Sequence, residues 1–224
     1  MLDIHSLLDN MKRPAFASED DFKFVFAYEL QKLLPDANVV LEYPHEIIAG
    51  KRSYIDIAIR RKKQYIPIEL KYKTKQANVL LREGEPFKLK NHSACDIGRY
   101  DFLRDIWRLE QLLKESHKFG PCGYAVLLTN DRMYWDKNSE QKINSNDRDF
   151  KFFDGDDTVI RKGIHSWYKN NEIAQYSGSR YRSLEFDNQY DIRWHDYFPS
   201  AANPSEPFRY VTVTVPVMSH NSRQ

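Results

Sequence analysis

Apolar residues recur along the chain with two different spacings, and each spacing predicts a different kind of element. Residues 18–34 carry apolar side chains three and four positions apart, which predicts an amphipathic helix. Ser18 can cap this helix, acidic residues occupy its first turn, and Pro35 ends it. Its apolar face consists of Phe22, Phe26, Leu30 and Leu33.

Shorter apolar runs with strand-like composition follow the first helix. We expect strands at residues 39–43, 54–60 and 65–72, with Pro44 stopping the first of them. The charged turn at residues 61–63 is short enough to join the second and third strands into a hairpin.

The helical spacing returns over residues 96–116, after a polar loop at 73–95. Residues 124–128 are then wholly apolar, which favours a strand that is buried on both faces beneath a covering helix. The apolar side of this second helix consists of Tyr100, Leu103, Ile106, Trp107 and Leu113.

The C-terminal part differs from the preceding residues in its composition and in the spacing of its apolar residues. Residues 136–157 are rich in Asp and Asn and predict loops, whereas residues 208–215 alternate as in a strand. The order of elements predicts a mixed α/β fold with a central mixed β-sheet flanked by helices. We expect a single domain, with a core over residues 18–130 and a C-terminal elaboration of strands and loops over residues 131–224.

Composition narrows the class of protein. The 224 residues are 41% hydrophobic and 14% aromatic, which predicts a globular chain rather than a disordered one. The two cysteines, Cys95 and Cys122, form no CxxC pair, which argues against a disulfide framework or a four-ligand zinc site. No segment resembles a secretory signal or a membrane helix, so we expect a cytoplasmic protein with no membrane partner.

Charged residues interrupt two of the predicted strands. Asp56 lies between two isoleucines, and Glu69 and Lys71 alternate with apolar residues, so these two share one face of their strand. If the strands form a hairpin, Asp56 comes near Glu69. Two carboxylates suit Mg²⁺, and a nearby ammonium can stabilise a reacting phosphate. The competing interpretation is an ordinary solvated strand face.

Two glutamates on the first predicted helix add to this picture. Glu29 falls on the apolar face, where a carboxylate needs a partner, so it is either a site residue or a member of a structural ion pair. Glu19 lies at the helix N-terminus, where the simplest interpretation is an interaction with the helix dipole.

Asp56, a twelve-residue gap and then Glu69-Leu70-Lys71 resemble the motif of the PD-(D/E)XK, or restriction-endonuclease-like, nuclease superfamily. The likeness covers roughly residues 18–130, and Ile55 stands where the motif has proline. The resemblance implies a restriction-endonuclease-like core and a magnesium-dependent nuclease.

In such a nuclease, Mg²⁺ or Mn²⁺ is held by Asp56 and Glu69, helped by the backbone carbonyl of Leu70. Lys71 then assists the attacking water, and a helical glutamate completes the site, for which Glu29 is the candidate.

Further segments resemble bacterial members of this superfamily that lack assigned functions. Residues 96–110 are similar to the helix after their motif, and residues 128–135, 194–197 and 208–210 are similar to their later segments. On that helix, Asp105 and Arg108 stand three residues apart and can form an ion pair that orients the helix. Alternatively, they contact the metal ligands and hold them in position, a role that Glu19 can share.

Positive charge gathers around the motif. The net charge of the chain is +2, yet residues 51–75 hold nine Lys and Arg against two acidic residues. This is +7, offset by −5 elsewhere, and it favours a polyanionic partner. Part of this run, residues 60–63, can equally be a solvated turn. The residues we expect to contact nucleic acid are Arg52, Lys73, Lys75, Lys88, Lys90 and His92.

The sequence therefore predicts a metal-dependent nuclease that hydrolyses phosphodiester bonds, with DNA as the expected substrate and a homodimer as a compatible assembly. One alternative is an inactive module of the same fold that binds nucleic acid or a protein partner. Another is an RNase of that fold. Loops that bind nucleotide phosphates, histidine-based metal motifs and serine-hydrolase elbows are not indicated.

Overall fold

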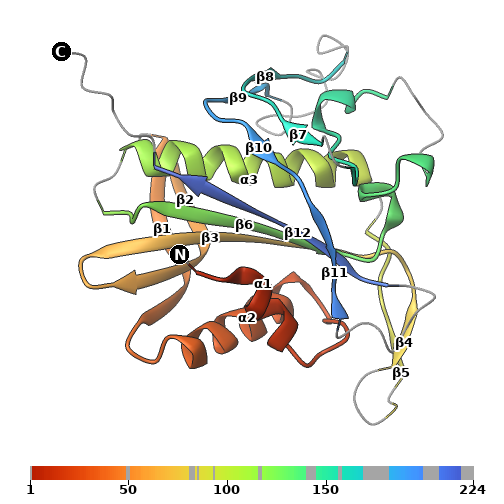
Figure 1. The fold of residues 1–224 in the computed structure, drawn as a ribbon, viewed down its shortest axis with the longest axis horizontal. Helices are drawn as coiled ribbons and strands as arrows, with labels where there is room; N and C mark the ends of the chain where they lie inside the picture. The colour runs from red at the N-terminus through yellow and green to blue at the C-terminus, as the bar shows by residue number, and fades with distance from the viewer. Residues whose placement is uncertain are drawn as a thin grey trace.

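A six-stranded mixed sheet lies between two helical layers in the computed structural model (Figure 1). The structure describes residues 2–48, 51–80, 84, 86–92, 94–115, 118–139, 145–155, 158–168, 182–198 and 207–217. Within them, the α-helices are α1 (Ile4–Asn10), α2 (Glu19–Leu33) and α3 (Cys95–Glu115). The strands of the sheet are β1 (Asn38–Ile48), β2 (Lys51–Arg61), β3 (Gln64–Lys73), β6 (Cys122–Thr129), β11 (Trp194–Asp196) and β12 (Arg209–Pro216).

The sheet has the order β1-β2-β3-β6-β12-β11. Its neighbours run antiparallel except for β3 and β6, which are parallel and are connected through α3. These features confirm the mixed α/β class and the central mixed sheet. The C-terminal residues contribute to this sheet directly, because β12 lies between β6 and β11.

Smaller elements surround the sheet. In the part of the chain that the structure describes, three two-stranded ladders lie outside the sheet: β4 (Asn78–Leu80) with β5 (Pro86–Lys88), β7 (Val159–Ile160) with β10 (Tyr190–Asp191), and β8 (Gly163–His165) with β9 (Leu184–Phe186). Short 3₁₀ helices occur at Arg132–Tyr134, Lys137–Ser139 and Arg148–Phe150. The first ladder forms within the segment that the sequence predicts as a loop.

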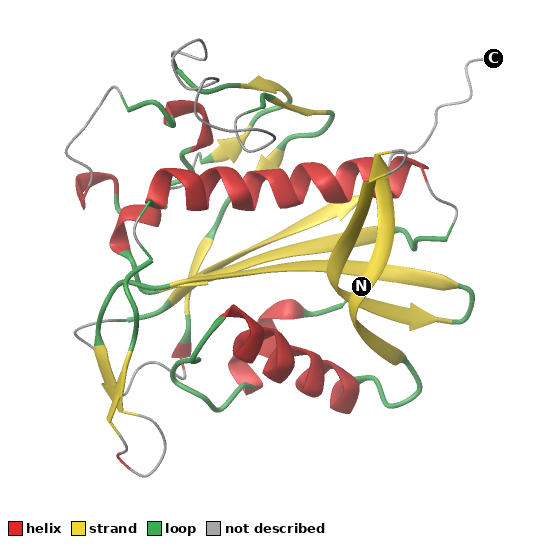
Figure 2. Cartoon of the chain, turned by 180° about the vertical axis from the view of Figure 1, so that it is seen from behind, coloured by secondary structure: helices red, strands yellow, loops and turns green. Residues whose placement is uncertain are grey.

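The two faces of the sheet carry separate hydrophobic cores. One face packs against α1 and α2, with Phe22 and Phe26 fully buried there. The other face packs against α3, 3₁₀ segments and the β7–β10 and β8–β9 ladders, whereas Val79 of β4 belongs to the first core. Figure 2 shows the same layers from behind. All eight residues of β6 are buried, as expected for a strand covered on both faces. Within the described residues, no helix is long and apolar enough to cross a membrane.

Helix α2 and the β2–β3 hairpin form as the sequence predicts, whereas β1 is longer. Helix α2 begins after Ser18, whose side chain accepts a hydrogen bond from the Asp21 N–H, so the predicted cap is confirmed. The hairpin of β2 and β3 is also confirmed. The stop at Pro44 is wrong, because β1 continues to Ile48. Since β1 is an edge strand, the missing N–H of a proline breaks no ladder between two partners.

Candidate active site

Strands β2 and β3 separate at the centre of the candidate site. Their ladder starts at the turn and ends at the pair Ile57 and Ile68, although Asp56 and Glu69 would be the next pair in register. Beyond that point β3 continues its parallel pairing with β6 alone. We call this separation the β2–β3 fork. It leaves one edge of β3, over residues 69–73, without a neighbouring strand from β2.

Two carboxylates take the place of the missing strand. Asp56 Oδ2 accepts a hydrogen bond of 2.8 Å from the Leu70 N–H, and Glu19 Oε2 accepts one of 3.0 Å from the Tyr72 N–H. The N–H and carbonyl of one strand residue point to the same side. The Leu70 carbonyl therefore points into the fork as well, where its contact is the Lys71 ammonium at 3.2 Å.

Helix α3 closes the fork on one face of the sheet. Asp105 Oδ2 lies 2.7 Å from Lys71 Nζ, and Arg108 Nη2 lies 3.2 Å from Glu69 Oε1. Arg108 also lies 3.5 Å from Asp105 and donates to the Ser53 hydroxyl and the Tyr54 carbonyl, which ties α3 to β2. Glu69 and Asp105 are almost completely buried, so their charges depend on these two cations.

Helix α2 closes the fork on the opposite face. Lys23 is buried on this helix, and its ammonium lies 3.1 Å from Asp56 Oδ1 and 3.4 Å from Asp20 Oδ1. The same ammonium also forms an ion pair with Glu42 on β1. Glu42 lies opposite Asp56 in the register of β1 and β2 and has a positive φ of 50°. A non-glycine residue in this conformation is strained, by about 1–3 kcal/mol.

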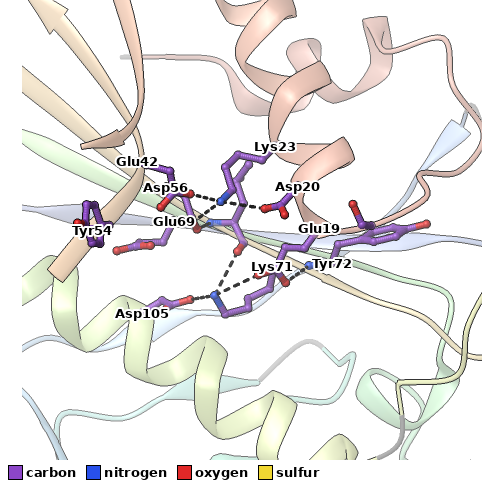
Figure 3. A network of polar contacts seen from close by, with 12 residues as sticks. Glu19, Asp20, Lys23, Glu42, Tyr54, Asp56, Glu69, Lys71, Tyr72 and Asp105 are labelled. Atoms are coloured by element: carbon purple, nitrogen blue, oxygen red, sulfur yellow. Dashed lines mark hydrogen bonds and ion pairs between the residues drawn. The ribbon is translucent and has the colours of Figure 1, made fainter. Parts of the chain in front are cut away.

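These groups form one network that passes through the sheet from α2 to α3, and Figure 3 shows most of its members converging on the fork. We call it the charge cluster. It consists of Glu19, Asp20, Lys23, Glu42, Asp56, Glu69, Lys71, Asp105 and Arg108. Six carboxylates thus face three cations, so the cluster carries an excess of negative charge.

Burial and neighbours move the pKa values of the carboxyl groups in opposite directions. Burial alone would raise the pKa of Asp56, but the Lys71 charge, the Leu70 N–H and Lys23 outweigh it, so this pKa is lowered. Burial and the adjacent Asp105 raise the pKa of Glu69 well above its ordinary value, and Arg108 only partly opposes them. Glu69 is therefore the carboxylate that would gain most from an added cation.

The cations of the cluster remain charged despite their burial. Desolvation would lower the pKa of Lys71, but Asp105, followed by Glu19, raises it overall. Desolvation acts on Lys23 in the same way and is outweighed by the hydrogen bond to Glu42 and the charge of Asp56, so the pKa of Lys23 is also raised. A positively charged Lys71 is the state required to stabilise a developing negative charge.

The fork holds oxygen donors of the kind that a divalent cation prefers. Asp56, Glu69 and the Leu70 carbonyl offer hard oxygen ligands, and water completes the shell of Mg²⁺ in such sites. The negative excess of the charge cluster and the raised pKa of Glu69 both favour an added positive charge. Among the described residues, no group of three or more His, Cys, Asp or Glu side chains could hold a metal ion. The fork instead offers two carboxylates and a main-chain oxygen.

Glu29, the helical glutamate chosen from the sequence, does not join this cluster. It lies ten residues beyond Glu19 on α2, about 15 Å further along at 1.5 Å per residue. There it forms an ion pair of 2.9 Å with Lys32. Glu19, for which the sequence favours a dipole role, instead reaches the fork through the Tyr72 N–H and lies 3.9 Å from Lys71.

The predicted nucleic-acid contacts lie mainly beyond the C-terminal end of β3. Lys75, Lys88, Lys90 and His92 are exposed, and Lys73 is half-buried. Thr74 connects the end of β3 to the segment at residues 90–92, since its N–H donates to His92 Nδ1 and its hydroxyl donates to the Lys90 carbonyl. Burial, with the charges of Lys73 and Lys90, lowers the pKa of His92. Arg52 belongs to β2, but its side chain lies outside the described residues.

Lys23 and Glu42 belong to the cluster although the sequence pattern did not single them out. A usable signal exists for Lys23, which stands three and four residues before Phe26 and Ala27 and so falls on the apolar stripe of α2. No comparable signal marks Glu42, because a left-handed glutamate inside a strand has no sequence signature.

Comparisons with known proteins find no counterpart for this chain: no family model matches it, and neither the curated proteins nor the solved structures provide a match. Function is therefore inferred from this chain's own sequence and structure.

Proposed function

We propose that the protein is a metal-dependent nuclease that hydrolyses phosphodiester bonds, with DNA as the expected substrate. The observation that carries this proposal is the β2–β3 fork, where Asp56 accepts from the Leu70 N–H, Glu69 precedes Leu70 on β3, and Lys71 contacts the Leu70 carbonyl. Strands that separate around buried charges add no stability to a sheet. A functional role of these charges is therefore the simplest explanation for the separation.

The proposal includes a restriction-endonuclease-like core. In its favour, a helix, a three-stranded meander, a second helix and a parallel strand follow in this order from α2 to β6. The motif residues Asp56 and Glu69 fall where adjacent strands diverge. The two helices cover opposite faces of the sheet (Figures 1 and 2).

Each residue of the fork has a role in this proposal. Asp56, Glu69 and the Leu70 carbonyl would hold Mg²⁺ or Mn²⁺, which when bound would polarise the phosphate and activate water. Lys71, held by Asp105 at 2.7 Å, stands where it can offset negative charge on the phosphate. Arg108 keeps Glu69 in place through its ion pair of 3.2 Å.

The exposed basic residues supply a path for the substrate backbone. Lys75, Lys88, Lys90 and His92 lie two or more positions beyond Lys73, where β3 ends. Such residues bind phosphates without reading sequence, and their contribution falls as salt rises.

A cleavage assay tests the proposal directly. Supercoiled plasmid, linear duplex, single-stranded DNA and RNA are incubated with Mg²⁺ or Mn²⁺ and the wild-type protein, Asp56→Asn, Glu69→Gln or Lys71→Ala. Lys63→Ala, in the exposed turn between β2 and β3, and Asp191→Asn, at an exposed position of β10, are matched controls. We expect cleavage by the wild type and both controls and its loss in the three site variants. Equal activity of all proteins would refute the site, and cleavage of RNA alone would make the protein an RNase.

One observation favours a second candidate, a module that binds nucleic acid without cleaving it. Asp56 and Glu69 already have cationic partners, Lys23 and Arg108, so the cluster can also be a structural bridge. Such a module would bind DNA in EDTA with a salt-dependent affinity and show no turnover with either metal. A filter-binding titration in EDTA beside the cleavage assay separates the two candidates.

A further inference from the structure

The ammonium of Lys23 occupies one of the two oxygens that Asp56 offers. Oδ2 of this carboxylate is engaged by the Leu70 N–H at 2.8 Å, and Oδ1 lies 3.1 Å from Lys23 Nζ. Any further cation that approaches Asp56 therefore meets a positive charge at Oδ1. This lysine is also buried, so it has little freedom to turn toward solvent.

Glu42 is a second carboxylate partner for the Lys23 ammonium. Its carboxylate forms an ion pair with the same ammonium, and it is about half exposed where Asp56 is mostly buried. Its left-handed backbone, opposite Asp56 in the β1–β2 register, is a strained conformation that persists only where its surroundings enforce it. Strain of this kind concentrates at functional sites.

We propose that Lys23 is a built-in competitor of the divalent cation at Asp56, and that Glu42 is the positioning residue that draws Lys23 away when the cation binds. This inference depends on the proposed metal site and adds a regulation of that site. In the metal-free protein, Lys23 neutralises Asp56 and keeps the fork closed on the α2 face. On metal binding, its ammonium gives up Asp56 and keeps Glu42, so a divalent cation replaces a single positive charge at Asp56.

This arrangement predicts opposite effects for two neighbouring substitutions. Lys23→Met keeps an unbranched apolar side chain in the same buried position and removes the competitor, so divalent affinity should rise. Glu42→Gln removes the alternative partner and leaves Lys23 on Asp56, so affinity should fall. A coupling between two sites of this kind changes affinity by about fivefold or more. Lys32→Met is the matched control, because it makes the same change on the same helix outside the cluster.

The measurement is a calorimetric titration of Mn²⁺ into the full chain without nucleic acid, supported by electron paramagnetic resonance of free Mn²⁺. Thermal melts in EDTA confirm that each variant is folded. We expect Lys23→Met to bind at least fivefold tighter, Glu42→Gln to bind at least fivefold weaker, and Lys32→Met to match the wild type. In Lys23→Met/Glu42→Gln, the Glu42 substitution should lose its effect, because its target is gone.

Each other outcome counts against a particular part of the reasoning. If Glu42→Gln weakens binding equally with and without Lys23, Glu42 acts on the ion directly and the competition is overturned. If Lys23→Met binds no tighter than the wild type while Asp56→Asn abolishes binding, the metal site stands and the competition fails. If neither the wild type nor Lys23→Met binds Mn²⁺, the metal site proposed above fails together with its regulation.

Discussion

Replacing Asp56 by alanine should destabilise the protein far more than replacing it by asparagine, although both changes remove the carboxylate. In Asp56→Ala, the buried Leu70 N–H loses its acceptor, which costs about 1–3 kcal/mol. Lys23 loses one of its three carboxylate partners, which adds roughly 1 kcal/mol. The sum of about 2–4 kcal/mol corresponds to a fall in Tm of roughly 5–15 °C for a chain of this size.

Asp56→Asn keeps an oxygen that can accept from Leu70 and loses only the charge, so its cost should be about 1 kcal/mol. Thermal and urea unfolding in EDTA at pH 7 measure both variants. An Asp56→Ala protein as stable as Asp56→Asn would refute the reasoning, because Asp56 would then not substitute for the missing strand. The asparagine variant is the proper probe of function, since its fold is nearly intact.

The same variant gives a pH dependence with a definite sign. The pKa of Asp56 is lowered in the folded protein, so this carboxylate stabilises the fold above its unfolded value, about 3.9. That contribution is lost as the pH falls through the folded pKa. The difference in unfolding free energy between wild type and Asp56→Asn should therefore be complete at pH 7 and shrink below about pH 4. A difference that stays constant to pH 3 would contradict the lowering of the Asp56 pKa by Lys71, the Leu70 N–H and Lys23.

Three further predictions address other parts of the molecule. Because the pKa of Glu69 is raised, its ionisation destabilises the metal-free fold as the pH rises from about 4.3 to the folded pKa. Glu69→Gln should therefore melt no lower than wild type at pH 8 in EDTA. A clearly lower Tm of this variant would contradict the raised pKa. In Gly98→Ala, the new Cβ would overlap the Tyr134 hydroxyl, so the Tm should fall and Tyr134→Phe in the same chain should restore part of it. An unchanged Tm in Gly98→Ala would mean that Tyr134, in the 3₁₀ helix Arg132–Tyr134, does not pack against Gly98 of α3. Replacing Lys88 and Lys90 by alanine should reduce the salt dependence of DNA binding, by about one unit of log–log slope for each phosphate that is no longer bound, and an identical slope in fluorescence anisotropy would exclude them as phosphate ligands.

Local signals in the sequence predict much of the scaffold. The Ser18 cap and the spacing of Phe22 and Phe26 place α2, and the short charged turn places the β2–β3 hairpin. The wholly apolar run in β6 predicts a strand covered on both faces, which its complete burial confirms. These features depend on residues close in sequence, and such signals survive when nothing is known about tertiary packing.

The candidate site is only partly predictable for the same reason. Asp56, Glu69 and Lys71 are recognisable because charges stand out on apolar strands. The choice of Glu29 relied on the angular position of a side chain on α2, whereas the position of the fork along that helix decides which glutamate reaches it. Where two strands separate is set by packing between distant elements, and the sequence carries no local mark of it.

The edge strand β1 departs from its predicted length for a related reason. Pro44 indicates a strand stop when the strand is assumed to have partners on both sides. Among the described residues, β1 pairs with β2 on one side only, so the proline is tolerated and the strand continues. Whether a strand is central or at an edge is a property of the whole sheet.

The order of the strands has a consequence for the synthesis of the chain. Every side chain of the charge cluster lies between residues 19 and 108, whereas the partner of β6 on its far side, β12, comes about one hundred residues later. A growing chain that has already assembled the cluster would thus present the apolar strand β6 with one edge unpaired until Arg209–Pro216 is made. An exposed apolar edge invites pairing with other chains. Slow translation or truncation before β12 should therefore favour aggregation over a soluble, partly folded product.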